Sequence, residues 1–232
     1  MNRMETGEGS ATVPVAQHQQ LPLFNTGPCV SMLPHPNAQI LGSWLQNGHA
    51  ESAILTGESK HLLSLLPDKI FRTCVTSPPY WSLRNYSIAG QIGLETSVET
   101  FIHNLVAVFE QVRRVLRDDG TLWLNIGDSY TSGGRTWRAP DKKNPVRAMD
   151  IRPPTPDGLK PKDLIGVPWR LAFALQDAGW YLRADIIWNK PNCQPESVKD
   201  RPTRSHEYLF LFSKDEHYLY NTAICAAQTE GT

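Results

Sequence analysis

The chain has 232 residues, with 23 Lys and Arg against 23 Asp and Glu, so its formal net charge at pH 7 is zero. This length suffices for one domain with a substantial core, and the neutrality argues against a protein that coats nucleic acid through bulk positive charge, while it leaves room for a local basic cleft. The four cysteines are scattered without a CxxC pair, which disfavours disulfides and a metal site and predicts a reducing, cytoplasmic location.

The N-terminal 50 residues differ from the rest of the chain. They are rich in Gly, Ser, Gln and Pro and show no hydrophobic periodicity, as in Gln17–Gln20. This composition predicts a flexible arm over residues 1–50, in which Leu21–Phe24 is a candidate docked patch. The arm lacks the apolar core of a signal peptide, and no stretch of the chain approaches the roughly 20 apolar residues that span a bilayer. We therefore expect no membrane contact and place the folded domain at residues 51–232.

Order is predicted to begin near residue 52. Ala53–Thr56 has the pattern of a short strand, and the leucines between residues 62 and 66 predict a helix that Pro67 closes. Glu58 precedes this helix, where a carboxylate can cap the first turn or remain solvated.

A stiff loop follows the next strand. Phe71–Thr76 is short and rich in β-branched residues, which predicts a buried strand. The two prolines of Ser77–Tyr80 end that strand, because proline fixes φ and cannot continue a ladder. In the loop the Pro78 carbonyl is unused, Ser77 offers a hydroxyl and Tyr80 offers a flat ring. These groups suit a planar ligand that carries an amino group; the alternative is a proline-rich turn covered by an aromatic ring.

The clearest predicted helix follows. Thr96 and Glu99 match a capping box, and Gly120 supplies the stop. Three arginines in the last turns complement the helix dipole, and we expect them to be solvated rather than bound to a ligand; they are Arg113, Arg114 and Arg117. One apolar stripe runs along the helix and comprises Phe101, Leu105, Val108, Val112, Val115 and Leu116.

A second core strand, Thr121–Ile126, runs into the polar loop Gly127–Tyr130. Strand, helix and strand in this order predict a right-handed parallel crossover. Ligands in such sheets bind outside the carboxyl ends of the strands. We therefore expect Ser77–Tyr80 and Asn125–Tyr130 to lie on the same side of the molecule.

Residues 131–160 form a long, basic connection. Long connections in compact domains are usually functional or disordered. Arg and Lys interleaved with aromatic residues suit phosphate contacts and base stacking, and a solvated loop is the alternative. The candidate contacts are Arg135, Arg138, Lys142, Lys143 and Arg147.

The last elements are a helix and two strands. Pro168 fits the first turn of the helix and Gly179 its stop. The strands are predicted at Asp185–Asn189 and Tyr208–Ser213. His206 beside Glu207 could be an acid–base pair or a hydrogen-bonded loop anchor, and we favour the anchor.

Taken in order, these motifs resemble the site-specific, amino-methylating DNA methyltransferases of the permuted β group. Ser77–Tyr80 resembles their motif IV, (Asp/Asn/Ser)-Pro-Pro-(Tyr/Phe/Trp), and the resemblance extends from about Ala53 to Ile224 through Leu122–Ser129, Lys160–Leu164 and the strand at His206–Leu211. It implies an α/β fold, the Rossmann-like fold of S-adenosylmethionine-dependent methyltransferases, with a mostly parallel sheet and helices on both faces. Ser at position 77 is typical of the cytosine-N4 enzymes, whereas Asp is commoner in adenine-N6 enzymes.

The resemblance also implies a mechanism. S-adenosyl-L-methionine would be the methyl donor and double-stranded DNA the substrate, with the target base flipped out. Ser77, Pro78, Pro79 and Tyr80 would be the catalytic residues, and Tyr80 and Trp81 would bind the base. Glu58 stands where the family has an Asp near the cofactor, which makes it a candidate cofactor contact.

One departure from the family pattern is large. The glycine-rich cofactor motif, Asp-Pro-Phe-x-Gly-x-Gly-Thr, does not follow the last strand in this sequence. We therefore expect a truncated enzyme whose C-terminal part is missing and whose cofactor binding is weak or absent. A chain that is inactive on its own is one alternative, and a second chain that carries the missing half is another. Without the missing strands, the strand at Phe71–Thr76 would become an exposed apolar edge. Two different functions also fit the sequence: an adenine-N6 methyltransferase and a non-catalytic fragment that binds DNA or a subunit.

Overall fold

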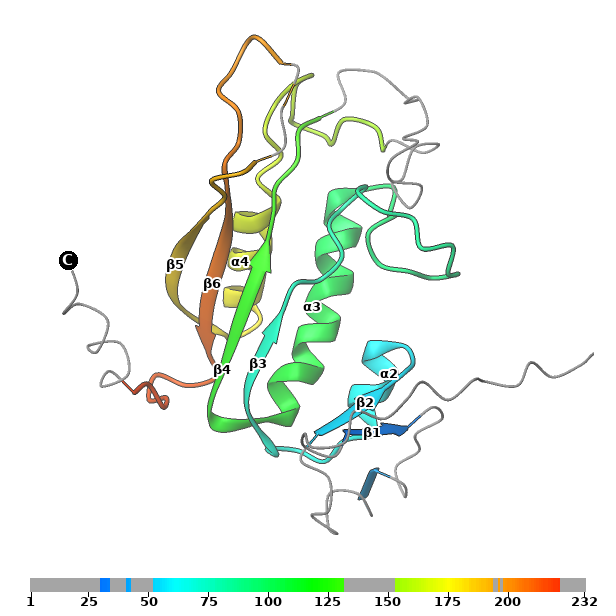
Figure 1. Cartoon of the computed structure of the whole chain (residues 1–232), viewed down its shortest axis with the longest axis vertical. Helices are drawn as coiled ribbons and strands as arrows, with labels where there is room; N and C mark the ends of the chain where they lie inside the picture. Colours follow the sequence, from blue (N-terminus) through cyan, green and yellow to red (C-terminus); the bar gives the residue numbers. More distant parts are fainter. Residues whose placement is uncertain are drawn as a thin grey trace, which may run out of the picture.

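A four-stranded sheet and the helices beside it organise the structure, a computed structural model that describes residues 30–33, 41–42, 52–131, 153–193, 196 and 198–221 (Figure 1). The side chains of residues 30–33 are not described. In chain order the elements are β1 (Val30–Leu33), β2 (Ser52–Leu55), α2 (Ser59–Ser64), β3 (Phe71–Thr76), α3 (Val98–Val115), β4 (Leu116–Ile126), α4 (Val167–Asp177), β5 (Tyr181–Asn189) and β6 (His206–Ser213).

The sheet has the strand order β3-β4-β6-β5. β3 and β4 pair in parallel, whereas β6 is antiparallel to both of its neighbours. Three of the four strands therefore run in one direction. The predicted parallel pairing across α3 is confirmed, and β6 is the exception to the mostly parallel sheet.

Ser97 is the N-cap of α3, because its hydroxyl accepts a hydrogen bond from the Thr100 N–H at 3.1 Å. The predicted capping box on Thr96 is therefore wrong by one residue. The predicted stop at Gly120 is also too late. α3 ends at Val115 and β4 begins at once, because the backbone from Leu116 onwards joins the sheet beside β3.

α3 and α4 pack against each other and cover one face of the sheet. Their core includes Leu122, Leu124, Phe210 and Phe212 from the sheet, with Phe101 and Leu105 from α3. Neighbours in a strand point to opposite faces. Val75 of β3 points away from the core, because its neighbour Cys74 faces the core, and it is 72% exposed. On β5, Trp188 pairs with Glu207 of β6 and is 55% exposed. Helices were predicted on both faces of the sheet, but in the described ranges they cover one face.

β3 is an edge strand of this sheet within the described residues. Its outward-facing Val75 and its first residue, Phe71, are both exposed. The exposed apolar edge predicted for this strand is confirmed.

The N-terminal part contributes an ordered strand that the predicted arm did not include. β1 pairs in parallel with β2 and forms a separate two-stranded sheet. Leu41 is 1% exposed and packs with Leu66 and Val115. The candidate patch at Leu21–Phe24 lies outside the described residues.

Arg114 holds α2 against α3. Its guanidinium donates to the carbonyls of Leu63 and Leu66 at 2.6 and 2.8 Å and pairs with Asp68 at 2.5 Å. The expectation that Arg114 is solvated is therefore wrong, because it satisfies the last carbonyls of a second helix. None of the helices in the described ranges has the length and apolar character needed to cross a bilayer.

Candidate active site

The proline loop lies at the carboxyl end of β3, where its polar groups meet those of β4. Ser77 is exposed, and its Oγ donates to Asn125 Oδ1 at 3.4 Å. Asn125 follows Leu124, the β4 partner of Thr76. The expected meeting of Ser77–Tyr80 with Asn125–Tyr130 is therefore confirmed.

Tyr80 connects this loop to β6. Its hydroxyl donates to Glu207 Oε2 at 2.9 Å and lies 3.2 Å from Asn125 Oδ1. Partial burial, followed by the charge and hydrogen bond of Glu207, raises the pKa of Tyr80 to about 12, although Ser77 acts in the opposite direction. The Tyr80 hydroxyl is consequently protonated at neutral pH and acts as a donor.

Glu207 is held by a second partner. Lys190, which directly follows β5, forms an ion pair with Glu207 Oε1. The carboxylate is largely buried, with 19% of its side chain exposed. Glu207 forms the hydrogen bonds expected of an anchor, with Tyr80 after the end of β3 and Lys190 after the end of β5. His206 and Glu207 were expected in a loop, but they are the first two residues of β6.

Gly127 allows Tyr80 to take this position. A Cβ built on Gly127 would lie 2.7 Å from Tyr80 Cε2 and 3.3 Å from Cδ2, closer than carbon atoms normally approach. A side chain at residue 127 would therefore displace the Tyr80 ring.

Asp128 joins the end of β4 to α4. Its carboxylate accepts from the N–H groups of Gly166 at 3.0 and 3.1 Å and of Val167 at 2.9 Å. The N-cap residue of α4, Gly166, has no side chain of its own to do this. Asp128 therefore caps α4 from a distant part of the sequence, with its negative charge at the positive end of the helix.

Trp81 lies in the core instead of the site. It is 4% exposed, and its indole N–H donates to the Glu95 carbonyl at 3.0 Å. A buried ring has no free face for a base, so the predicted base contact of Trp81 is not supported by this geometry. Tyr80 remains the candidate for stacking.

Glu58 caps α2. Its carboxylate accepts from Lys60 N at 2.9 Å and from His61 N at 2.6 Å. The capping alternative for Glu58 is therefore present, and both carboxylate oxygens take part in it.

The five predicted DNA contacts, Arg135, Arg138, Lys142, Lys143 and Arg147, lie outside the described residues. The two ends of the connection over residues 131–160 are hydrogen-bonded to each other. Thr131 N donates to the Asp163 carbonyl at 2.9 Å, and Thr131 Oγ1 donates to the Lys160 carbonyl at 2.7 Å. The basic segment therefore leaves and returns near the carboxyl end of β4.

Sequence reasoning assigned no individual role to three residues that surround Tyr80: Asn125, Gly127 and Lys190. The available signal was polarity within apolar strands, since Asn125 is an amide between Leu124 and Ile126. Such a residue is expected to have a hydrogen-bond partner. The sequence gives no indication of which one, because Tyr80 and Glu207 are 127 positions apart.

Two other features do not take part in the site. Burial raises the pKa of the Cys74 thiol, which disfavours the reactive thiolate. No group of three metal-ligating side chains occurs in the described ranges.

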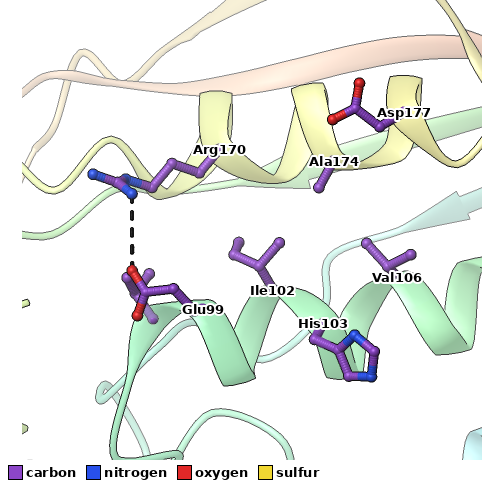
Figure 2. Close-up of a pocket in the computed structure, with 8 residues that line it drawn as sticks. Glu99, Ile102, His103, Val106, Arg170, Ala174 and Asp177 are labelled. Carbon is purple, nitrogen blue, oxygen red and sulfur yellow. Dashed lines mark ion pairs between the residues drawn. The ribbon is translucent and has the colours of Figure 1, made fainter.

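A groove of about 390 Å³ lies between α3 and α4, where Ile102 and Val106 point towards Ala174 (Figure 2). No residue of Ser77–Tyr80 lines this groove, so we do not place the reaction there.

Comparison with known proteins gives a consistent result. Residues 71–230 match the family model for DNA methylases of the N6/N4 type. The chain is 63% identical over 180 residues to the type II methyltransferase M.XycI of Xanthomonas campestris pv. cyanopsidis, covering 78% of this chain and 60% of the relative. It is 64% identical over 177 residues to M.SmaI of Serratia marcescens, covering 76% and 61%. The chain thus spans about 60% of the length of these curated relatives.

The fold is similar to that of a solved DNA methyltransferase. The structure superposes on the PvuII DNA methyltransferase, described as cytosine-N4-specific, with a TM-score of 0.51 and 18% sequence identity. The superposition covers 76% of this chain and 54% of that one. At this identity the similarity supports the fold alone.

Proposed function

Because this chain belongs to the N6/N4 family of DNA methylases, we propose that it methylates DNA at the exocyclic N4 amino group of cytosine in a specific site. The proposed methyl donor is S-adenosyl-L-methionine. The observation that carries the proposal is the partly exposed Ser77–Tyr80 loop at the carboxyl end of β3, with Ser77 bonded to Asn125 and Tyr80 bonded to Glu207.

The residues of the loop have distinct roles in this proposal. An amine within a base pair is not accessible to chemistry, so the target base leaves the stack. The Tyr80 ring stacks on the base, and the Pro78 carbonyl and Ser77 Oγ accept hydrogen bonds from the two N–H bonds of the amine. These bonds would orient the nitrogen lone pair out of the base plane for attack on the methyl group of a bound donor. The donor sulfur would leave as a thioether, and the nitrogen would release one of its protons to solvent at the exposed Ser77. Pro79 keeps the loop stiff. No covalent enzyme intermediate is required.

The cytosine specificity rests on Ser at position 77. A carboxylate in that position is commoner in adenine-N6 enzymes of this group, which remain the alternative. The DNA contacts are proposed for Arg135, Arg138, Lys142, Lys143 and Arg147, because their segment is inserted in the connection that follows β4, the strand whose Asn125 meets Ser77. Glu58 as a cofactor contact, and a second chain with the cofactor-binding half, remain predictions.

The test is a methylation assay with the purified full chain. Unmethylated bacterial genomic DNA is incubated with S-adenosylmethionine and digested, and the nucleosides are quantified by mass spectrometry, so that the recognition site need not be known. We expect N4-methylcytosine, and a loss on the order of 100-fold for Ser77→Ala and for Tyr80→Ala, because misplaced reactants cost about this much. Ser64→Ala and Tyr181→Ala, at exposed positions on α2 and β5, are the matched controls.

Each result has a clear consequence. N6-methyladenine as the product would move the assignment to the adenine enzymes. Full activity in a Ser77→Ala, Tyr80→Ala double variant would contradict the roles given to the loop. No methylation by the unmodified chain would contradict the proposal that it is active in this form.

A further inference from the structure

The direction in which the Ser77 hydroxyl points its proton determines whether Ser77 can accept a hydrogen bond from an amine. A carboxylate at this position would have no proton and could only accept. A serine hydroxyl carries one proton, and it accepts well from an amine only if that proton is directed elsewhere. The residue that takes the Ser77 proton therefore affects whether Ser77 can act as an acceptor for a base amine.

Asn125 is placed to take this proton. Its Nδ2 donates to the Tyr208 carbonyl at 3.1 Å, and a carbonyl can only accept. The other end of the amide, Oδ1, therefore points towards the loop, 3.4 Å from Ser77 Oγ. Asn125 pairs with Leu209 in the antiparallel ladder of β4 and β6, so the backbone of both strands fixes its position.

Tyr80 competes for the same oxygen. The Tyr80 hydroxyl lies 3.2 Å from Asn125 Oδ1, but it is closer to Glu207 Oε2, at 2.9 Å. A carboxylate is a stronger acceptor than an amide oxygen. Lys190 holds the other carboxylate oxygen of Glu207. The single Tyr80 proton is therefore directed to Glu207, which leaves Asn125 Oδ1 available to Ser77.

We infer that Asn125 is a positioning residue that takes the Ser77 proton and turns the Ser77 lone pairs towards the target amine, and that Glu207 keeps Asn125 free for this by taking the Tyr80 proton. This inference rests on the proposed function, because it assumes that an amine is the ligand of Ser77. Neither residue touches the substrate; both act through Ser77 and Tyr80.

The first test does not depend on activity. Melting temperatures are measured for the full chain, Ser77→Ala, Asn125→Leu and the double variant. We expect Ser77→Ala to lower the melting temperature in the presence of Asn125 and to have no further effect in the Asn125→Leu background, since contacting residues are non-additive. Additive shifts would overturn the inference.

The inferred role of Glu207, which is to take the Tyr80 proton, is tested by titrating the tyrosine absorbance near 295 nm. The Tyr80 signal is the difference between the full chain and Tyr80→Phe, and its transition is expected at about 12. Glu207→Gln should lower that pKa, because it removes the negative charge beside the hydroxyl. Glu99→Gln, in the groove between α3 and α4, should leave it unchanged. An unchanged Tyr80 transition in Glu207→Gln would overturn the role of Glu207.

The last test asks whether Asn125 affects methylation because it accepts the Ser77 proton. Methylation rates are compared for Asn125→Leu in the Ser77 and in the Ser77→Asp backgrounds. A carboxylate has no proton to redirect, so we expect the loss caused by Asn125→Leu to be at least tenfold smaller in the Ser77→Asp background. Equal losses would show that Asn125 is merely structural. If the unmodified chain does not methylate DNA, the proposed function fails, whereas the melting and tyrosine measurements still decide the hydrogen-bond arrangement.

Discussion

Removing the carboxylate of Asp128 should loosen α4. Asp128→Ala deletes the acceptor of the Gly166 and Val167 N–H groups at the helix start. Gly166 offers no side chain to replace it, and Pro168 has no N–H. The cap and the favourable charge at the helix N-terminus are therefore lost together.

The size of the effect follows from these two contributions. Loss of a helix cap costs about 0.5–2 kcal/mol, and a negative charge at a helix N-terminus contributes about 0.3–1 kcal/mol. Asp128→Ala should therefore lower the free energy of unfolding by about 1–3 kcal/mol, a large part of the roughly 5–15 kcal/mol of a typical domain. With a denaturant slope of about 2 kcal/mol per molar urea, the midpoint should fall by roughly 0.5–1.5 M.

Urea unfolding followed by circular dichroism measures this change. Asp128→Asn keeps one oxygen acceptor and loses the charge, so it should cost only about 1 kcal/mol. Asp177→Ala is the matched control, because Asp177 is exposed at the other end of α4, and its effect should stay within about 0.5 kcal/mol. A loss below about 0.5 kcal/mol in Asp128→Ala, or equal losses in the Ala and Asn variants, would refute the capping argument.

Two further predictions concern Tyr80. Gly127→Ala places a Cβ 2.7 Å from Tyr80 Cε2, so it should displace the ring and reduce methylation in the genomic DNA assay while the fold persists by circular dichroism; unchanged turnover would show that the ring position is not needed. Because the folded pKa of Tyr80, about 12, lies above the unfolded value near 10, its contribution to stability should be complete below pH 10 and be lost between about pH 10 and 12. Urea midpoints across this range should show the loss in the full chain, and a Tyr80→Phe variant with the same pH dependence would contradict it.

Local patterns predicted much of the sheet. The strand at Phe71–Thr76 has the bounds that were expected, because a β-branched run ended by prolines has few alternatives. The meeting of Ser77 with Asn125 also followed from the sequence, since a parallel crossover brings the carboxyl ends of both strands to one edge.

The errors arose where long-range contacts decide between similar local options. Thr96 and Ser97 can both cap a helix, and only the tertiary placement of α3 selects Ser97. Arg114 has the position of a dipole partner on its own helix, yet it binds the carbonyls of α2. Trp81 could belong to a site or to a core, and the Glu95 carbonyl that satisfies its N–H lies 14 residues away.

The position of β6 bears on how the protein is made. Although β6 is the last described strand in the sequence, it occupies the sheet between β4 and β5. During synthesis, β5 therefore has no partner until residues 206–213 have left the ribosome, and Tyr80 waits more than 120 residues for the carboxylate that binds its hydroxyl. A nascent chain halted before residue 206 should hence contain the proline loop, but the Tyr80 hydroxyl would lack the Glu207 carboxylate that binds it. The amino-acid sequence thus delays the assembly of this site until β6 is inserted.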